Sequence, residues 1–134
     1  MSDYAKLEEL TQMILDAELA ELRARAEEVA KIRAKREELV RARAERADRL
    51  SDAPPEDDLA FSTGQDALWH IWLNRETQQL GTELAQAATR QEQQRLRAKR
   101  AFGRVEALGR LRAQEATERK LKSMRKVTDQ ISSL

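Results

Sequence analysis

His70 is the only histidine of the chain, and it is the side chain best suited to bind a metal ion or to act as a general base. Such a site needs further groups at helical spacing, and only Asp66, four residues earlier, meets that requirement. The chain has no cysteine, which excludes thiolate ligands and disulfides. A lone His–Asp pair is ordinary on a helix surface, so we predict no metal site and no cofactor.

Carboxylates are abundant, but their spacing is that of a solvated helix face. The pairs Glu8–Glu9, Glu27–Glu28 and Glu37–Glu38 lie among lysines and arginines. Catalysis requires groups that converge in a pocket, and the chain has no glycine-rich phosphate loop of the Walker type. We therefore predict no catalytic residues and no enzymatic activity.

The elements that carry these residues are predicted to be long helices. Charged residues make up 37% of the 134 positions, hydrophobic residues 40% with many alanines, and aromatic residues only 4%. This composition is typical of coiled coils. Apolar residues also alternate at spacings of four and three, the rhythm of a coiled-coil seam, in the run Leu15, Leu19, Leu22, Ala26 and Val29.

One segment interrupts the helical pattern, because it contains both prolines, Pro54 and Pro55. The pattern predicts helix one over about 4–50, a connector over 51–64 and helix two over about 65–132, with Ser62 or Thr63 as the N-cap of the second helix. The fold class is all-α: a single domain formed by an elongated, antiparallel two-helix coiled-coil hairpin.

Charge supports pairing between the two halves of the chain. Residues 1–66 hold 17 acidic and 11 basic side chains, a net charge of −6, and residues 67–134 hold 7 and 14, a net of +7. In a hairpin, residue 4 lies near residue 111, so about 20 C-terminal residues extend beyond helix one. Packing is expected to be weak near Arg36 and Arg43, and along the polar stretch 91–97.

Two surfaces are predicted to bind partner proteins. The first lies at the turn, where two tryptophans stand close together and such residues are enriched at binding hot spots; its residues are Trp69, Trp72, Leu73, Leu39, Val40 and Arg43. The second lies at the end that carries both termini and includes the amphipathic C-terminal segment; its residues are Leu7, Leu10, Ile14, Leu121, Met124, Arg125 and Ile131.

The sequence disfavours a nucleic-acid partner, a membrane-spanning helix and a signal peptide. The basic stretches 95–100 and 119–126 lack interleaved aromatic residues, and the net charge is only +1, so we expect no nucleic-acid partner. No stretch of 18 apolar residues is present, and the first residues lack the pattern of a signal peptide. We expect a cytoplasmic protein that is able to associate peripherally with the inner face of the membrane.

The layout resembles the export-stalk proteins of bacterial flagella (FliJ type) and of type III secretion injectisomes (YscO type). The likeness extends over the whole hairpin and includes the alternating basic, alanine and leucine residues of the stretch 100–112. It implies a coiled-coil stalk whose terminal end engages a hexameric export ATPase. The side towards the turn would contact the membrane export gate, and export chaperones would be further partners.

The alternative is another structural or scaffolding coiled coil, such as a phage scaffold, an ATPase stalk subunit or a dimerising spacer. A monomeric hairpin favours the export stalk, whereas a stable dimer favours the alternative. Binding to nucleic acid or to a membrane surface is a third reading.

Overall fold

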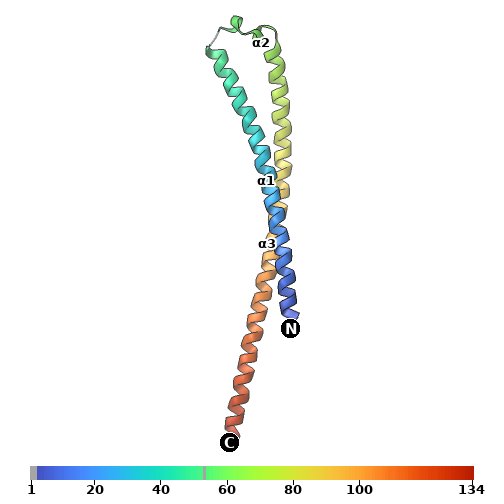
Figure 1. Ribbon diagram of the computed structural model, residues 1–134, viewed down its shortest axis with the longest axis vertical. Helices are drawn as coiled ribbons and strands as arrows, with labels where there is room; N and C mark the ends of the chain where they lie inside the picture. The colour runs from blue at the N-terminus through green and yellow to red at the C-terminus, as the bar shows by residue number, and fades with distance from the viewer. Residues whose placement is uncertain (1–2, 53) are drawn as a thin grey trace. The chain divides into compact units, whose positions relative to one another are not determined.

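The fold is an all-α helical hairpin, as the sequence predicts. The computed structural model describes residues 3–52 and 54–134. Its elements are helix α1 (Asp3–Asp52), the 3-10 helix η1 (Pro55–Asp57), the single-turn helix α2 (Leu59–Ser62) and helix α3 (Gln65–Ser132), and these described residues form no strand (Figure 1). Neither long helix contains, within the described ranges, an apolar stretch sufficient to cross a bilayer.

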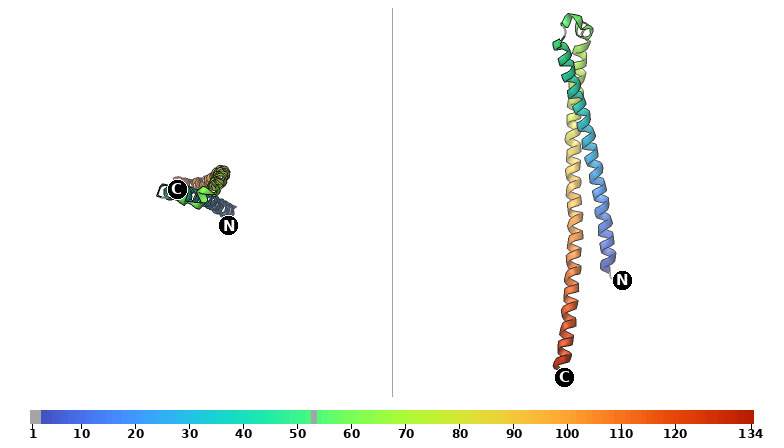
Figure 2. Two further views of the ribbon diagram at one scale, coloured as in Figure 1. Left: turned by 90° about the horizontal axis from the view of Figure 1, so that it is seen from above. Right: turned by 60° about the vertical axis from the view of Figure 1, so that its left-hand side comes forward.

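The chain divides into two compact units, and each contains a part of α1 and a part of α3. The terminal unit comprises Met1–Leu22 and Gln94–Leu134, and the turn unit comprises Arg23–Gln93. In the turn unit the two helices spread apart towards the connector in the view of Figure 1, and they overlap there in the right-hand view of Figure 2.

The two helices run antiparallel in each unit, because residue numbers rise along one helix while those of the contacting residues fall along the other. In the turn unit, Arg90 pairs with Glu28 and Asp66 pairs with Arg46. In the terminal unit, Arg112 pairs with Glu8, and Gln94 bonds to Glu18.

The contact seam of α3 has a seven-residue repeat. Leu73, Leu80, Ala87, Gln94 and Ala101 are all buried and follow one another at intervals of seven. This regularity keeps one face of the helix against its neighbour. Gln94 is the polar member of the series, and its amide nitrogen donates to the main-chain oxygen of Glu18 at 3.0 Å and to its carboxylate at 2.7 Å.

The matching seam of α1 differs from its predicted course by one position. Leu15 and Val29 are buried and Leu22 is half-buried, as a seam requires, but Leu19 is 38% exposed. The alternation of three and four from Leu15 leads to Glu18, whose side chain holds Gln94. Leu19 was therefore wrongly placed in the seam, because apolar character alone favoured it over its polar neighbour Glu18.

The connector is more ordered than its sequence suggests. Asp58 is the N-cap of α2 and accepts a hydrogen bond from the main-chain N–H of Phe61 at 3.0 Å. The predicted cap of α3 was wrong, because the hydroxyls of Ser62 and Thr63 donate back to the carbonyl oxygen of Leu59. Gly64 links the two helices with a φ of 81°, a conformation that favours glycine, and α3 begins at the next residue.

Candidate partner-binding surfaces

Arg46 joins helix α1 to both sides of the connector. Its two terminal nitrogens donate to the carboxylate of Asp58 at 2.7 Å each, and its Nε donates to Asp66 at 2.6 Å. The three side chains are only 14%, 19% and 8% exposed, respectively. A bidentate pair with a second carboxylate is a strong arrangement, so Arg46 fixes the turn that positions the nearby tryptophans.

The ion pairs at Arg46 change the acidity of its partner. Hydrogen bonding to Arg46, with a further bond from the N–H of Phe61, lowers the pKa of Asp58 to about 2. Hydrogen bonds to Asp58 and Asp66 in turn raise the pKa of Arg46. This cluster was not predicted from the sequence, although Arg46 lies seven residues after Leu39 on the seam and acidic residues stand on both sides of the prolines.

His70 lies beside the same cluster. Its Nε2 is 3.4 Å from the second carboxylate oxygen of Asp66, and its ring meets Trp69 edge-on with centroids 5.0 Å apart. Asp66 is also bound by Arg46, so the contact between His70 and Asp66 adds to the ion-pair cluster at the turn. Across the described ranges, no three histidine or carboxylate side chains are grouped as a metal site would need.

The residues of the predicted turn surface are not equally accessible. Trp72 is 49% exposed and Val40 is 59% exposed, whereas Leu73 is 1% exposed and lies in the core of the helix pair. Trp69 and Leu39 are half-buried. Arg43 is exposed and donates to the side-chain oxygen of Asn74 at 2.8 Å, so it joins α1 to α3. Burial therefore removes Leu73 from the surface that a partner can contact.

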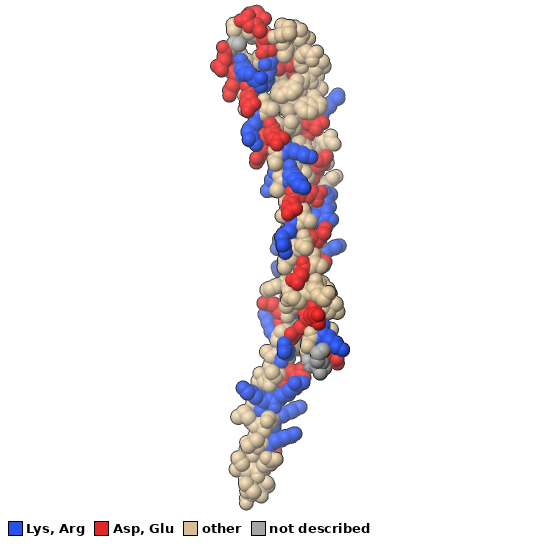
Figure 3. Space-filling model, viewed as in Figure 1, with Lys and Arg blue, Asp and Glu red and all other residues tan. Residues whose placement is uncertain are grey.

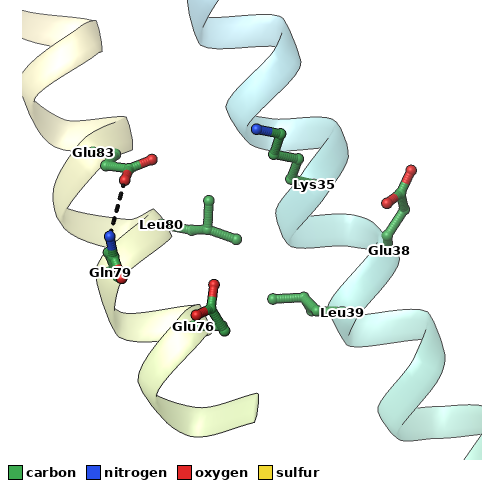
Figure 4. Close-up of a pocket in the computed structure, with 7 residues that line it drawn as sticks. All are labelled: Lys35, Glu38, Leu39, Glu76, Gln79, Leu80 and Glu83. Carbon is green, nitrogen blue, oxygen red and sulfur yellow. Dashed lines mark hydrogen bonds between the residues drawn. The ribbon is translucent and has the colours of Figure 1, made fainter. Parts of the chain in front are cut away.

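A groove of about 280 Å³ opens between the helices of the turn unit. Figure 4 shows Leu39 and Leu80 pointing towards each other across it, with carboxylates around them. Glu83 accepts a hydrogen bond from Gln79 at 3.4 Å in its rim. Its lining residues are Lys35, Glu38, Leu39, Glu76, Gln79, Leu80 and Glu83.

A second, larger groove of about 600 Å³ involves Leu84 and the exposed Val40, and it is rich in arginine. Its charged lining residues are Arg33, Arg36, Glu37 and Arg41. The seam between 32 and 43 is therefore open on one carboxylate-rich side and one arginine-rich side. Trp72 is in line with Glu76, Gln79 and Glu83 at spacings of four, three and four, so it extends the carboxylate-rich side.

All seven residues of the predicted terminal surface are exposed. Leu7, Leu10 and Ile14 of α1 are 47%, 53% and 40% exposed. On α3, Leu121 is 48% exposed and Met124 and Ile131 are both 64% exposed. Arg125 is also exposed, and Met13 and Val127, at 62% and 52%, enlarge the apolar area.

The end of α3 has no partner helix among the described residues. From 113 to 134 every residue is exposed except Glu115, which is half-buried and accepts from Arg119 at 2.6 Å. The seven-residue seam would continue at Lys122 and Asp129, which are charged. The apolar stripe at Leu121 and Met124 is turned away from the seam by one or two residues, or about 100–200°. It therefore cannot serve as a simple continuation of the hairpin core.

The charges on the terminal unit are divided between its two helices. Residues 3–22 contain six acidic side chains and one lysine, whereas 119–126 contain five basic side chains and no acidic one. Figure 3 shows lysines and arginines gathered on the C-terminal part of α3, with uncharged residues at its tip. The exposed C-terminal segment is thus both apolar and basic, which suits a protein surface of the opposite charge.

No family model, curated protein or solved structure matches the chain.

Proposed function

We propose that this protein is a non-enzymatic coiled-coil stalk or adaptor of a bacterial flagellar or type III protein export apparatus. It engages a hexameric export ATPase through the terminal surface and links that ATPase to the export gate. It acts in the cytoplasm and associates peripherally with the inner face of the membrane.

The observation that carries this proposal is the exposed end of α3. A segment of 22 residues that is helical up to Ser132, is exposed almost throughout and has an apolar stripe gains stability by binding another surface. The five basic side chains over 119–126 favour an acidic partner. A protein that only had to form a hairpin would not need this segment.

The turn unit supplies the second contact that an adaptor needs. Trp72 and Val40 are exposed on α3 and α1, and Arg46 holds the connector in place beside them. We assign this surface to the export gate. Export chaperones are further candidates for the grooves on the two sides of the seam.

The direct test is the ATP hydrolysis rate of the export ATPase from the same organism, with and without the purified protein. We expect the full-length chain to raise the rate or the hexamer population. A variant that ends at residue 112 should lose the effect, because it lacks the exposed segment but retains every described contact between α1 and α3. The double variant Leu121→Glu, Met124→Glu should behave like the truncation.

The matched control is Gln78→Glu with Gln86→Glu, which adds the same charge at exposed positions of α3 in the turn unit. This control should stimulate as the unmodified chain does. A full-length protein without effect on the ATPase would refute the assignment to an export stalk.

A dimerising spacer is the second candidate function. The stripe Leu7, Leu10 and Ile14 on α1 favours it, because an antiparallel partner helix leaves these side chains uncovered. Sedimentation equilibrium tests this candidate, because a chain that is monomeric at all concentrations cannot act as a dimerising spacer.

A further inference from the structure

The terminal unit has two uncovered apolar stripes, one on each helix. The stripe of α1 consists of Leu7, Leu10, Ile14 and Ala17, and the stripe of α3 consists of Leu121, Met124, Thr128 and Ile131. Within one chain these stripes do not meet, because α3 is a single helix that pairs with α1 only up to Arg112 and then continues past its end.

The two stripes lie on the same side of the helix pair. In an antiparallel pair, positions displaced from the seam in the same direction along both sequences share a side. The groove on one side of the terminal unit illustrates this rule, because Ala5 and Glu9 of α1 and Gly109 of α3 all line it, and each follows a seam position by one residue. On α1, the residues Leu7, Leu10 and Ile14 each precede a seam position by one residue. On α3, Leu121 likewise precedes Lys122, where the seam would continue, by one residue. The two stripes therefore face the side opposite to this groove.

The two stripes also share one spacing. Both progress by three, four and three residues, so a difference of 114 in residue number aligns them along their whole length. Helices with the same three-and-four repeat pack side by side. The stretch of α1 in the terminal unit, 3–22, and the exposed segment, 113–134, are nearly equal in length.

The charges of the two segments indicate which helix covers these stripes. Residues 3–22 have a net charge of −5, from six acidic side chains and one lysine, and 113–134 have a net charge of +2, from five basic and three acidic side chains. Two C-terminal segments placed together would bring basic residues against basic residues. One C-terminal segment beside α1 brings opposite charges together.

We propose that a second copy of the chain covers this face, with segment 113–134 of each copy lying parallel to residues 3–22 of α1 in the other. Leu10 of one copy then lies beside Met124 of its partner copy. The contact is reciprocal, so it closes as a twofold dimer and leaves no free stripe for further addition. It uses the same terminal surface as the proposed ATPase contact, but its existence does not depend on that function.

The absence of cysteine makes the test direct. Leu10→Cys and Met124→Cys variants are purified separately, mixed, and treated with a short bismaleimide crosslinker. We expect the mixture to form a covalent dimer far faster than either variant alone. Gln78→Cys, at an exposed position of the turn unit, replaces Met124→Cys in the control mixture and should not crosslink to Leu10→Cys.

Sedimentation equilibrium gives the independent measurement. The unmodified chain should show a monomer–dimer equilibrium that shifts towards monomer as salt concentration rises. Leu121→Glu with Met124→Glu should abolish the dimer with no loss of helix content in circular dichroism, because both side chains are exposed.

Three results would overturn the proposal. The first is a chain that is monomeric at every concentration and salt condition. The second is crosslinking of Met124→Cys to itself as efficiently as to Leu10→Cys, which would indicate paired C-terminal segments. The third is growth beyond the dimer, which a closed twofold contact does not allow. None of these results is read from the export ATPase, whereas the proposed function is tested by the hydrolysis rate of that ATPase, so failure of the dimer is distinguishable from failure of the proposed function.

Discussion

Replacing Leu73 by alanine should destabilise the turn unit, whereas the same replacement at Leu121 should not. Leu73 is 1% exposed and is the largest fully buried side chain among the described residues, and Leu121 is 48% exposed on the same helix. Both changes remove the same atoms from α3 and carry the same helix propensity effect. The difference between the two variants therefore isolates the burial of the leucine.

The magnitude follows from burial and from the shape of the fold. A buried leucine replaced by alanine costs about 2–5 kcal/mol, the larger values arising where a cavity cannot collapse. Only one helix packs against Leu73, so its surroundings can close and water can enter. We therefore expect a loss of about 2–3 kcal/mol for Leu73→Ala, and a change within about 0.5 kcal/mol for Leu121→Ala.

The assay is urea unfolding of both variants and of the unmodified chain at a protein concentration at which the chain is monomeric, followed by tryptophan fluorescence and by circular dichroism. Fluorescence reports on the turn unit, because Trp69 and Trp72 are the only tryptophans and both lie in it. Equal losses of unfolding free energy in the two alanine variants would refute the assignment of Leu73 to the core. They would also refute the view that the end of α3 contributes no packing to the monomer.

Three further predictions follow from named contacts. Replacing Arg46 by alanine should speed hydrogen exchange over 55–66, since three hydrogen bonds to Asp58 and Asp66 are lost, and lysine should restore the protection only in part because it cannot form the bidentate pair. Acidification should remove stability between about pH 4 and pH 2, because folding lowers the pKa of Asp58 from 3.8 to about 2. The stabilisation by ionised Asp58 is complete above the pKa of the unfolded chain and is lost as pH falls through the pKa of the folded chain. Asp58→Asn should therefore flatten the pH profile of the urea midpoint in that window. Replacing Gln94 by leucine should raise the thermal midpoint, because an apolar side chain at this buried seam position adds hydrophobic contact, and an unchanged or lower midpoint would show that its bonds to Glu18 outweigh that gain.

The regular parts of the fold could be predicted from local rules. Spacing of apolar residues and the two prolines place the long helices, and α3 begins at the expected Gln65. The prediction failed where two neighbouring residues competed for one role. Leu19 is more apolar than Glu18, yet Glu18 occupies the seam because its carboxylate meets Gln94 across the helix pair. Likewise, Ser62 and Thr63 are good caps by residue type, but their hydroxyls close α2, a helix that the sequence pattern did not predict.

The candidate surfaces could be predicted only in part. Exposure of Leu7 and Leu10 follows from a stripe that is wider than one neighbouring helix can cover, and exposure of Met124 follows from the predicted extension of helix two beyond helix one. The Arg46 cluster could not be predicted in the same way, because it joins residues 46, 58 and 66 through a connector whose course depends on those same contacts. Leu73 was wrongly assigned to the turn surface, because it stands next to the two tryptophans in the sequence although it occupies a buried seam position of α3.

The exposed end of α3 does not result only from the shorter length of α1. Past Glu115, the positions that would continue the seam are Arg119, Lys122, Lys126 and Asp129, while the apolar residues are turned to another face. A longer α1 would meet this charged face, and its apolar residues would gain nothing there. Appending residues with the heptad of α1 before its N-terminus should therefore add helix content but leave Leu121 and Met124 as accessible to a maleimide probe at introduced cysteines as before. Protection of those cysteines by the added helix would show that the stripe belongs to the hairpin core, and both the partner contact and the dimer would then lose their basis.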